Sequence, residues 1–155
     1  MDYLAVYVPD LKWIDYDMGQ LENYDTKPPV EWPCALISFP ATPYTALSGL
    51  AQIGSPTIMI RLGFAPFSQS YQAAPSLVRD KALYYFEIEQ KIFNALQGYK
   101  TEYTDAFIRV SADDEMRNDL FKVRVLTFTT NYEDYSAVPM NQKTPATLSI
   151  TPNII

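Results

Sequence analysis

The chain has 155 residues with no histidine and one cysteine, Cys34, and its 18 acidic and 12 basic side chains give a net charge of −6. Without an imidazole, one chain cannot assemble a Ser-His-Asp or Cys-His site, and a zinc site normally needs several Cys and His ligands. We therefore expect a protein that is not an enzyme and holds no cofactor. The acidic balance argues against sequence-specific binding of nucleic acid, which depends on clustered Lys and Arg.

The length fits one folded α+β domain, which we place at residues 1–135, followed by an extended C-terminal arm at residues 136–155. A domain of this size buries roughly two thirds of the surface of its unfolded chain. A single cysteine cannot form an internal disulfide, and no stretch approaches the roughly 18 apolar residues of a membrane helix. We expect a reducing compartment and no membrane partner.

The first predicted elements are short and apolar. Residues 1–10 fit either a strand or one or two turns of helix, and the pattern does not choose between them. Residues 34–39 form an apolar run between Pro33 and Pro40, which predicts a strand, because proline cannot donate a hydrogen bond to a sheet. Residues 57–65 alternate between apolar and other side chains and are the clearest strand.

A long region is almost uncharged, since residues 32–79 contain no acid and only Arg61 and Arg79 as bases. Within it, residues 41–56 and 65–75 have the composition of two long loops. Interface centres are depleted in charge, so we expect these loops at contacts between subunits; the alternative is a polar loop region in a monomer. The candidate interface residues in the loops are Tyr44, Leu50, Phe67 and Tyr71.

Residues 76–98 predict one long helix, with Ser76 as its N-cap and Gly98 as its C-terminal cap. At about 100° per residue its apolar side chains fall on one half of the helix. They are Val78, Ala82, Tyr85, Phe86, Ile88, Ile92, Phe93 and Leu96.

Residues 106–110 and 121–129 predict a hairpin of two strands joined through an acidic turn at residues 113–115. Its second strand changes its apolar face, from Val123 and Val125 to Leu126 and Phe128. Such a change indicates either a bulge or a strand covered on both faces.

The element order β-β-α-β-β predicts an α+β fold. We expect an antiparallel or mixed sheet of about four strands with one long helix packed on it, preceded by a short variable N-terminal element.

Glu89 is the one charge within the apolar half of the predicted helix. A buried carboxylate needs a partner. We expect Glu89 to be at least half buried and paired with Arg61, Arg109 or Arg124, each of which lies on a predicted strand.

Three other motifs have simple structural interpretations. Asp15 and Asp17 precede Gly19 but lack the glycine and glutamate positions of a calcium loop, so we expect no metal there. The acidic residues 113–115 read as a solvated turn. Cys34 lies in an apolar strand, where a small buried thiol is expected.

The C-terminal arm has no helical period, but Leu148 and Ile150 alternate with small polar residues near its end. This pattern fits a strand that adds to an exposed sheet edge, in its own chain or in a neighbour, so both residues are candidate interface residues.

Residues 11–22 (LKWIDYDMGQLE) and 27–37 (KPPVEWPCALI) resemble small structural proteins encoded by phages and prophages of gut bacteria. The later order of strand 57–65, helix 76–98 and hairpin 106–129, ending in residues 128–134 (FTTNYED), is similar to the tail-terminator, or tail-completion, family of long-tailed phages. The resemblance covers about residues 11–135.

This resemblance implies a non-enzymatic virion protein that forms a homo-oligomeric ring, typically of six subunits. The ring would cap the tail tube and join it to the head, so its partners would be the tail tube protein and a head-completion or neck protein. It would be assembled in the cytoplasm of the host bacterium and lie at the tail or head–tail junction of the virion. The alternatives are a neck or connector protein of the same virion, or a small non-viral binding module that acts as a monomer or dimer.

Overall fold

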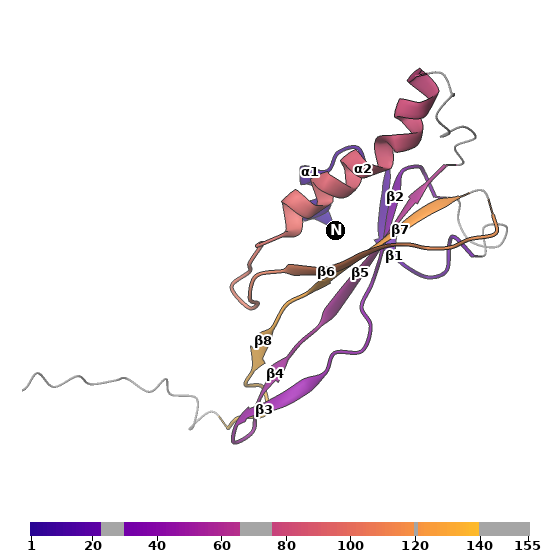
Figure 1. The fold of residues 1–155 in the computed structure, drawn as a ribbon. Coiled ribbons are helices and arrows are strands. Elements are labelled where there is room, and N and C mark those ends of the chain that lie inside the picture. The colour runs from indigo at the N-terminus through magenta and orange to yellow at the C-terminus, as the bar shows by residue number, and fades with distance from the viewer. Residues whose placement is uncertain (23–29, 66–75, 120, 140–155) are drawn as a thin grey trace, which may run out of the picture.

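The computed structural model describes residues 1–22, 30–65, 76–119 and 121–139, and only the backbone of residues 77–82. This part of the chain holds two helices and eight strands, which form two sheets (Figure 1). In chain order they are α1 (Asp2–Tyr7), β1 (Trp13–Tyr16), β2 (Cys34–Ser38), β3 (Tyr44–Ser48), β4 (Ala51–Gly54), β5 (Thr57–Phe64), α2 (Ser76–Leu96), β6 (Ile108–Asp114), β7 (Lys122–Thr129) and β8 (Tyr132–Asp134).

The larger sheet has the strand order β1-β2-β5-β7-β6, and its centre is the antiparallel pair β5 and β7. β2 lies antiparallel to β5 on one side, and β6 lies antiparallel to β7 on the other. β1 is parallel to β2, with Trp13 opposite Cys34 and Tyr16 opposite Ile37.

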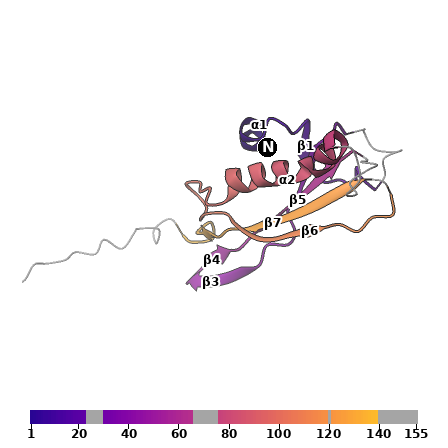
Figure 2. The same ribbon diagram turned by 45° about the horizontal axis from the view of Figure 1, so that its top comes forward.

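Both helices lie on one face of the larger sheet (Figure 2). Ile88 and Ile92 of α2 are fully buried there, because they fall on the inner side of the helix, one turn apart. They join one apolar cluster with α1 and with alternate residues of the strands. The buried members are Leu4, Val8, Leu11, Ala35, Ile37, Ile60, Leu62, Phe64, Ile88, Ile92, Leu126 and Phe128.

The opposite face of the sheet carries a second, smaller cluster of Leu21, Val30, Cys34, Leu36 and Val123, with Trp13, Trp32 and Phe121 packed against it. Gly63 lies directly opposite Cys34 in the register of β5 and β2. A Cβ atom on this glycine would lie 2.7 Å from both the Cys34 sulfur and the Trp32 ring. A side chain at this position would therefore displace the centre of the second cluster.

The smaller sheet has the order β3-β4-β8 and projects from one end of the larger one (Figure 1). Its strand β4 leads into β5, and β7 leads into β8, so the same two segments run through both sheets. The two segments keep one register through both sheets, because Gly54 is opposite Tyr132 in the smaller sheet and Thr57 is opposite Thr129 in the larger one. Only Ser55 and Pro56 interrupt the pairing between the two sheets. The projection is thus a continuation of the central strand pair.

The fold class expected from the sequence, one helix on a single sheet of about four strands, is wrong. The described part of the chain is mostly β, with eight strands in two sheets and two helices. Residues 41–56, expected to be a loop, contain β3 and β4. All five residues of β3 are exposed, so this strand has no alternation between buried and exposed positions for a sequence pattern to reveal.

Several individual elements lie where the sequence predicts them. Residues 1–10 form the helical alternative, α1, while β2, β5 and α2 begin at Cys34, Thr57 and Ser76, as expected. Gly98 has a φ of 79°, the left-handed conformation of a C-terminal cap. No helix in residues 1–22, 30–65, 76–119 or 121–139 is long and apolar enough to cross a membrane.

The second strand of the expected hairpin, β7, is covered on both faces. It pairs with β5 residue for residue, and the irregularity lies instead in β6, between Arg109 and Ser111. Val123 is buried in the second cluster, while Leu126 is buried in the first.

We predict that Gly63→Ala lowers the stability of the protein by about 1–3 kcal/mol, the usual cost of forcing extra atoms into a packed core. Denaturant unfolding of the variant and the parent measures this difference. Ser48→Ala is the control, because Ser48 is exposed on strand β3 and lies outside both apolar clusters. A Gly63→Ala protein as stable as the parent would show that the second cluster is loosely packed.

Candidate functional site

The exposed strand of the smaller sheet is the most prominent surface for contact with another molecule. β3 lies at the edge of this sheet, and all five of its residues are exposed. An edge strand presents N–H and C=O groups that can pair with another chain. Two large side chains predicted for an interface lie here: Tyr44 is 48% exposed, and Leu50, in the turn between β3 and β4, is 61% exposed.

Two tyrosines meet across the middle of the smaller sheet, above Gly54. Tyr44 of β3 and Tyr132 of β8 are both opposite Gly54 in the register. Their rings are perpendicular, with centroids 6.2 Å apart, and their hydroxyl groups are hydrogen bonded. A Cβ on Gly54 would lie 2.7 Å from Tyr132, so the absence of a side chain lets the rings meet. This hydrogen bond raises the pKa of Tyr132.

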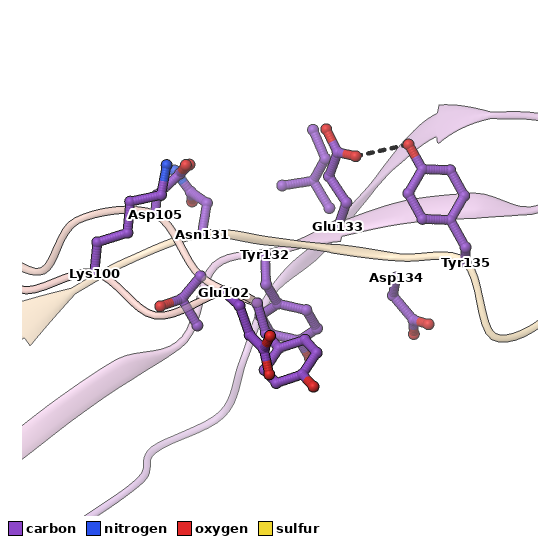
Figure 3. A pocket seen from close by; sticks show the side chains of 11 residues that line it. Lys100, Glu102, Asp105, Asn131, Tyr132, Glu133, Asp134 and Tyr135 are labelled. Carbon is purple, nitrogen blue, oxygen red and sulfur yellow. Dashed lines mark hydrogen bonds between the residues drawn. The ribbon is translucent and has the colours of Figure 1, made fainter. Parts of the chain in front are cut away.

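A cleft of about 640 Å³ runs between β8 and the loop that follows α2 (Figure 3). The β8 side contributes residues 131–135, and the loop contributes residues 102–105 together with Lys100. Four acids line the cleft, opposed by one lysine. They are Glu102, Asp105, Glu133 and Asp134.

Two of the four carboxylates of the cleft are hydrogen bonded by phenols. The Tyr135 hydroxyl donates to Glu133 Oε2 at 2.6 Å, drawn as the dashed line in Figure 3. This bond raises the pKa of Tyr135, and a bond to Glu102 raises the pKa of Tyr103. Within the described part of the chain, no ion pair involves Glu102 or Glu133, nor the third acid, Asp105.

Four acids near the sheet face opposite the helices, Asp17, Glu22, Glu115 and Asp119, are in contrast bound by arginines. Arg61 of β5 donates to Asp17 at 2.9 Å and to Glu115 at 2.8 Å, and it also binds Glu22. Its side chain is only 12% exposed. Arg61 therefore ties the segment after β1 and the turn after β6 to the centre of the sheet, and it is not a partner of Glu89.

Arg117 completes this network from the turn between β6 and β7. It donates to Glu115 at 2.7 Å and to the carbonyl oxygen of Leu21 at 2.8 Å, and it pairs with Asp119. Burial alone would raise the pKa of Glu115, but the hydrogen bonds from Arg61 and Arg117 outweigh burial and hold it below its ordinary value. The expectation of a simply solvated turn at residues 113–115 is therefore wrong for Glu115. It is also wrong for Asp113 and Asp114, which lie at the end of strand β6, where Asp114 pairs with Lys122 and Arg124.

Glu89 pairs with Arg124 beneath α2. The Arg124 Nε donates to Glu89 Oε2 at 2.7 Å, and its Nη2 donates to Oε1 at 3.1 Å. The two side chains are 12% and 13% exposed. Arg109 lies farther from Glu89, at 3.8 Å, with its guanidinium 4.0 Å from the centre of the Phe93 ring. Of the three arginines that were expected as partners of Glu89, Arg124 thus forms the bidentate ion pair.

Cys34 is fully buried between β5 and the Trp32 ring. Burial raises the pKa of its thiol to about 11, so the thiolate that attacks other molecules is scarce at neutral pH. Its position agrees with the expected core thiol.

The other candidate interface residues, Phe67, Tyr71, Leu148 and Ile150, lie outside the described residues. Neither the cleft nor the Arg61 network was predicted from the sequence. Asp17 and Glu115 lie 44 and 54 residues from Arg61 along the chain, so no local spacing connects them. The only signal was a lone arginine in the middle of a strand.

We predict that Glu89→Ala costs about 3 kcal/mol of stability, because it leaves the buried Arg124 with only the exposed Asp114 as a carboxylate partner. Glu87→Ala is the matched control, since Glu87 is exposed on the same helix. Urea unfolding of both variants tests this prediction. Equal midpoints for the two variants would contradict it.

We predict that Glu115→Gln destabilises the protein by about 1–2 kcal/mol at pH 7, since it weakens the three charged hydrogen bonds that Glu115 accepts from Arg61 and Arg117. The pKa of Glu115 is lower in the folded state than its ordinary value of 4.5. Its ion pairs therefore stabilise the fold above about pH 4.5, and this contribution is lost as the pH falls through the folded-state pKa. The difference in melting temperature between variant and parent should shrink from pH 7 to pH 3; a constant difference would exclude the ionised carboxylate as its cause.

Among the described residues, no group of three or more His, Cys, Asp or Glu side chains is arranged to hold a metal ion. No family model matches the chain, and no curated protein matches it. A functional interpretation therefore depends on the residues and surfaces described above.

Proposed function

We propose that the protein is a non-enzymatic structural component of a phage virion, a tail-terminator or tail-completion protein. In this role it forms a ring, of six subunits, that caps the tail tube and joins it to a head-completion or neck protein. The ring is assembled in the cytoplasm of the host bacterium and becomes part of the virion at the head–tail junction.

The observation that carries this proposal is the wholly exposed strand β3 at the edge of a projecting sheet. Stable monomers protect such edges with charges, prolines or covering segments. β3 has the sequence Tyr44-Thr45-Ala46-Leu47-Ser48, which carries neither a charge nor a proline. A subunit that meets neighbours through this strand needs no protection of its edge once it is assembled.

The aromatic and aliphatic side chains around β3 support the same use. Tyr44, Leu47 and Leu50 are all exposed, and they lie on β3 or in the turn that follows it. Tyrosine is enriched at protein interfaces, because its ring is apolar while its hydroxyl group still forms hydrogen bonds.

A small binding module that acts as a monomer or dimer is the second candidate function. The cleft beside β8 favours it, since its volume lies in the range that is typical of ligand sites.

A neck or connector protein of the same virion would use the exposed strand in the same way as a tail terminator.

We predict that the purified protein forms rings of about six subunits, with a solution mass about six times that of the chain. Light scattering over a concentration series and negative-stain imaging measure this. A Thr45→Lys and Leu47→Lys double variant should remain folded but lose the ring, because lysines on an edge strand prevent its pairing.

The matched control is the double variant Gln90→Lys and Asn94→Lys, which adds the same charge on the exposed side of α2 and should keep the ring. A native protein that stays monomeric or dimeric at every concentration would contradict the proposal and leave the binding module as the function.

A further inference from the structure

We propose that the cleft beside β8 binds an extended segment of a partner protein that carries lysine or arginine, and that this segment adds to the smaller sheet as a strand against β8. The inference goes beyond the proposed ring and does not depend on it. It follows from three features at the same place: a sheet edge, a preformed cleft, and carboxylates that make no ion pair with a described residue.

The first element is the outer edge of β8. In the order β3-β4-β8, this strand is the last, and within the described part of the chain it pairs only with β4. An extended peptide that adds to such an edge gains main-chain hydrogen bonds, and its alternate side chains enter the flanking surfaces.

The second element is the opposite wall of the cleft, which is held in place before any partner binds. The Asp105 N–H donates to the carbonyl oxygen of Asn131 at 2.8 Å, and the Thr130 hydroxyl donates to the carbonyl oxygen of Asp105 at 2.7 Å. Within the loop, the Thr104 N–H donates to the Thr101 hydroxyl at 3.1 Å. Because the wall is already ordered, less conformational entropy is lost when a partner binds.

The third element is charge, which selects the partner. Several acids of the body are paired with arginines, including Glu115 with Arg61 and Glu89 with Arg124. Those of the cleft, Glu102, Asp105 and Glu133, make no ion pair with a described residue. Carboxylates that make no ion pair within the described part of the chain favour a cationic partner.

Tyrosines of the cleft favour the same partner. Tyr103, Tyr132 and Tyr135 all line it, and Tyr103 is among the most exposed large side chains. Lysine and arginine are attracted to the faces of aromatic rings. A basic strand therefore meets carboxylates and aromatic faces together, whereas an acidic or purely apolar strand does not match the carboxylates.

The test is fluorescence anisotropy with the full chain and a labelled short peptide that has lysine at every second position, with threonine and valine between. We expect saturable binding that weakens as salt is raised from about 0.1 M to 1 M. A peptide with glutamate in place of lysine should not bind. The lysine peptide methylated on alternate backbone nitrogens should bind much more weakly, because it lacks the N–H groups that would donate main-chain hydrogen bonds to β8.

The variant that tests the site is Glu102→Gln, Asp105→Asn and Glu133→Gln together. Three partly exposed ion pairs of ordinary strength correspond to a loss of affinity of about three- to a hundredfold. The matched control is Glu31→Gln, Glu87→Gln and Asp113→Asn, which makes the same changes at exposed acids outside the cleft. The control should bind like the parent, and circular dichroism melting checks that both triple variants are folded.

Two results would overturn the proposal. An equal loss of affinity in the two triple variants would mean that the peptide responds only to overall charge. Equal binding of the methylated and unmethylated peptides would mean that no strand is added to β8. Neither result bears on ring formation, which is measured without a peptide.

Discussion

The antiparallel ladder between β5 and β7 is the interaction on which the other parts of the molecule depend. Its eight residue pairs form the centre of the larger sheet, with β2 and β6 on either side. Beyond Pro56 the same two segments continue as β4 and β8, still in register. Proline cannot donate to a ladder, but the Pro56 carbonyl oxygen accepts from the Thr129 hydroxyl at 3.2 Å, which keeps the segments together across the break. Both the exposed strand and the cleft are thus positioned by one strand pair.

Some carboxylates of the chain are held by arginines, whereas others make no ion pair with a described residue. In the body, arginines hold carboxylates from distant segments: Arg61 and Arg117 fasten one face of the larger sheet, and Arg124 fastens α2 to the other. Around the cleft, Glu102 and Glu133 lack an arginine among the described residues. The acids bound by arginines stabilise the fold, while the acids of the cleft are available to a partner. The net charge of the chain does not reveal this division.

The sequence predicts elements whose pattern is set by burial. β5 alternates because one of its faces packs under the helices, and α2 shows a helical period because Ile88 and Ile92 enter the same core. β3 and β8 were missed because one is exposed throughout and the other has only three residues. The carboxylate partners of Arg61 also come from distant parts of the chain, so only the folded sheet brings them together. The prediction of a single sheet was wrong because it assumed that every strand has a buried face.

The position of Cys34 has a practical consequence for labelling. It is the only cysteine of the chain, it is fully buried, and its thiol has a pKa of about 11. Maleimides react with thiolates that solvent can reach, so the folded native chain should resist them. A cysteine introduced at an exposed position such as Leu50 would then be the single reactive thiol, without removal of the native one. A fluorophore or spin label attached there would report distances from the tip of the projecting sheet.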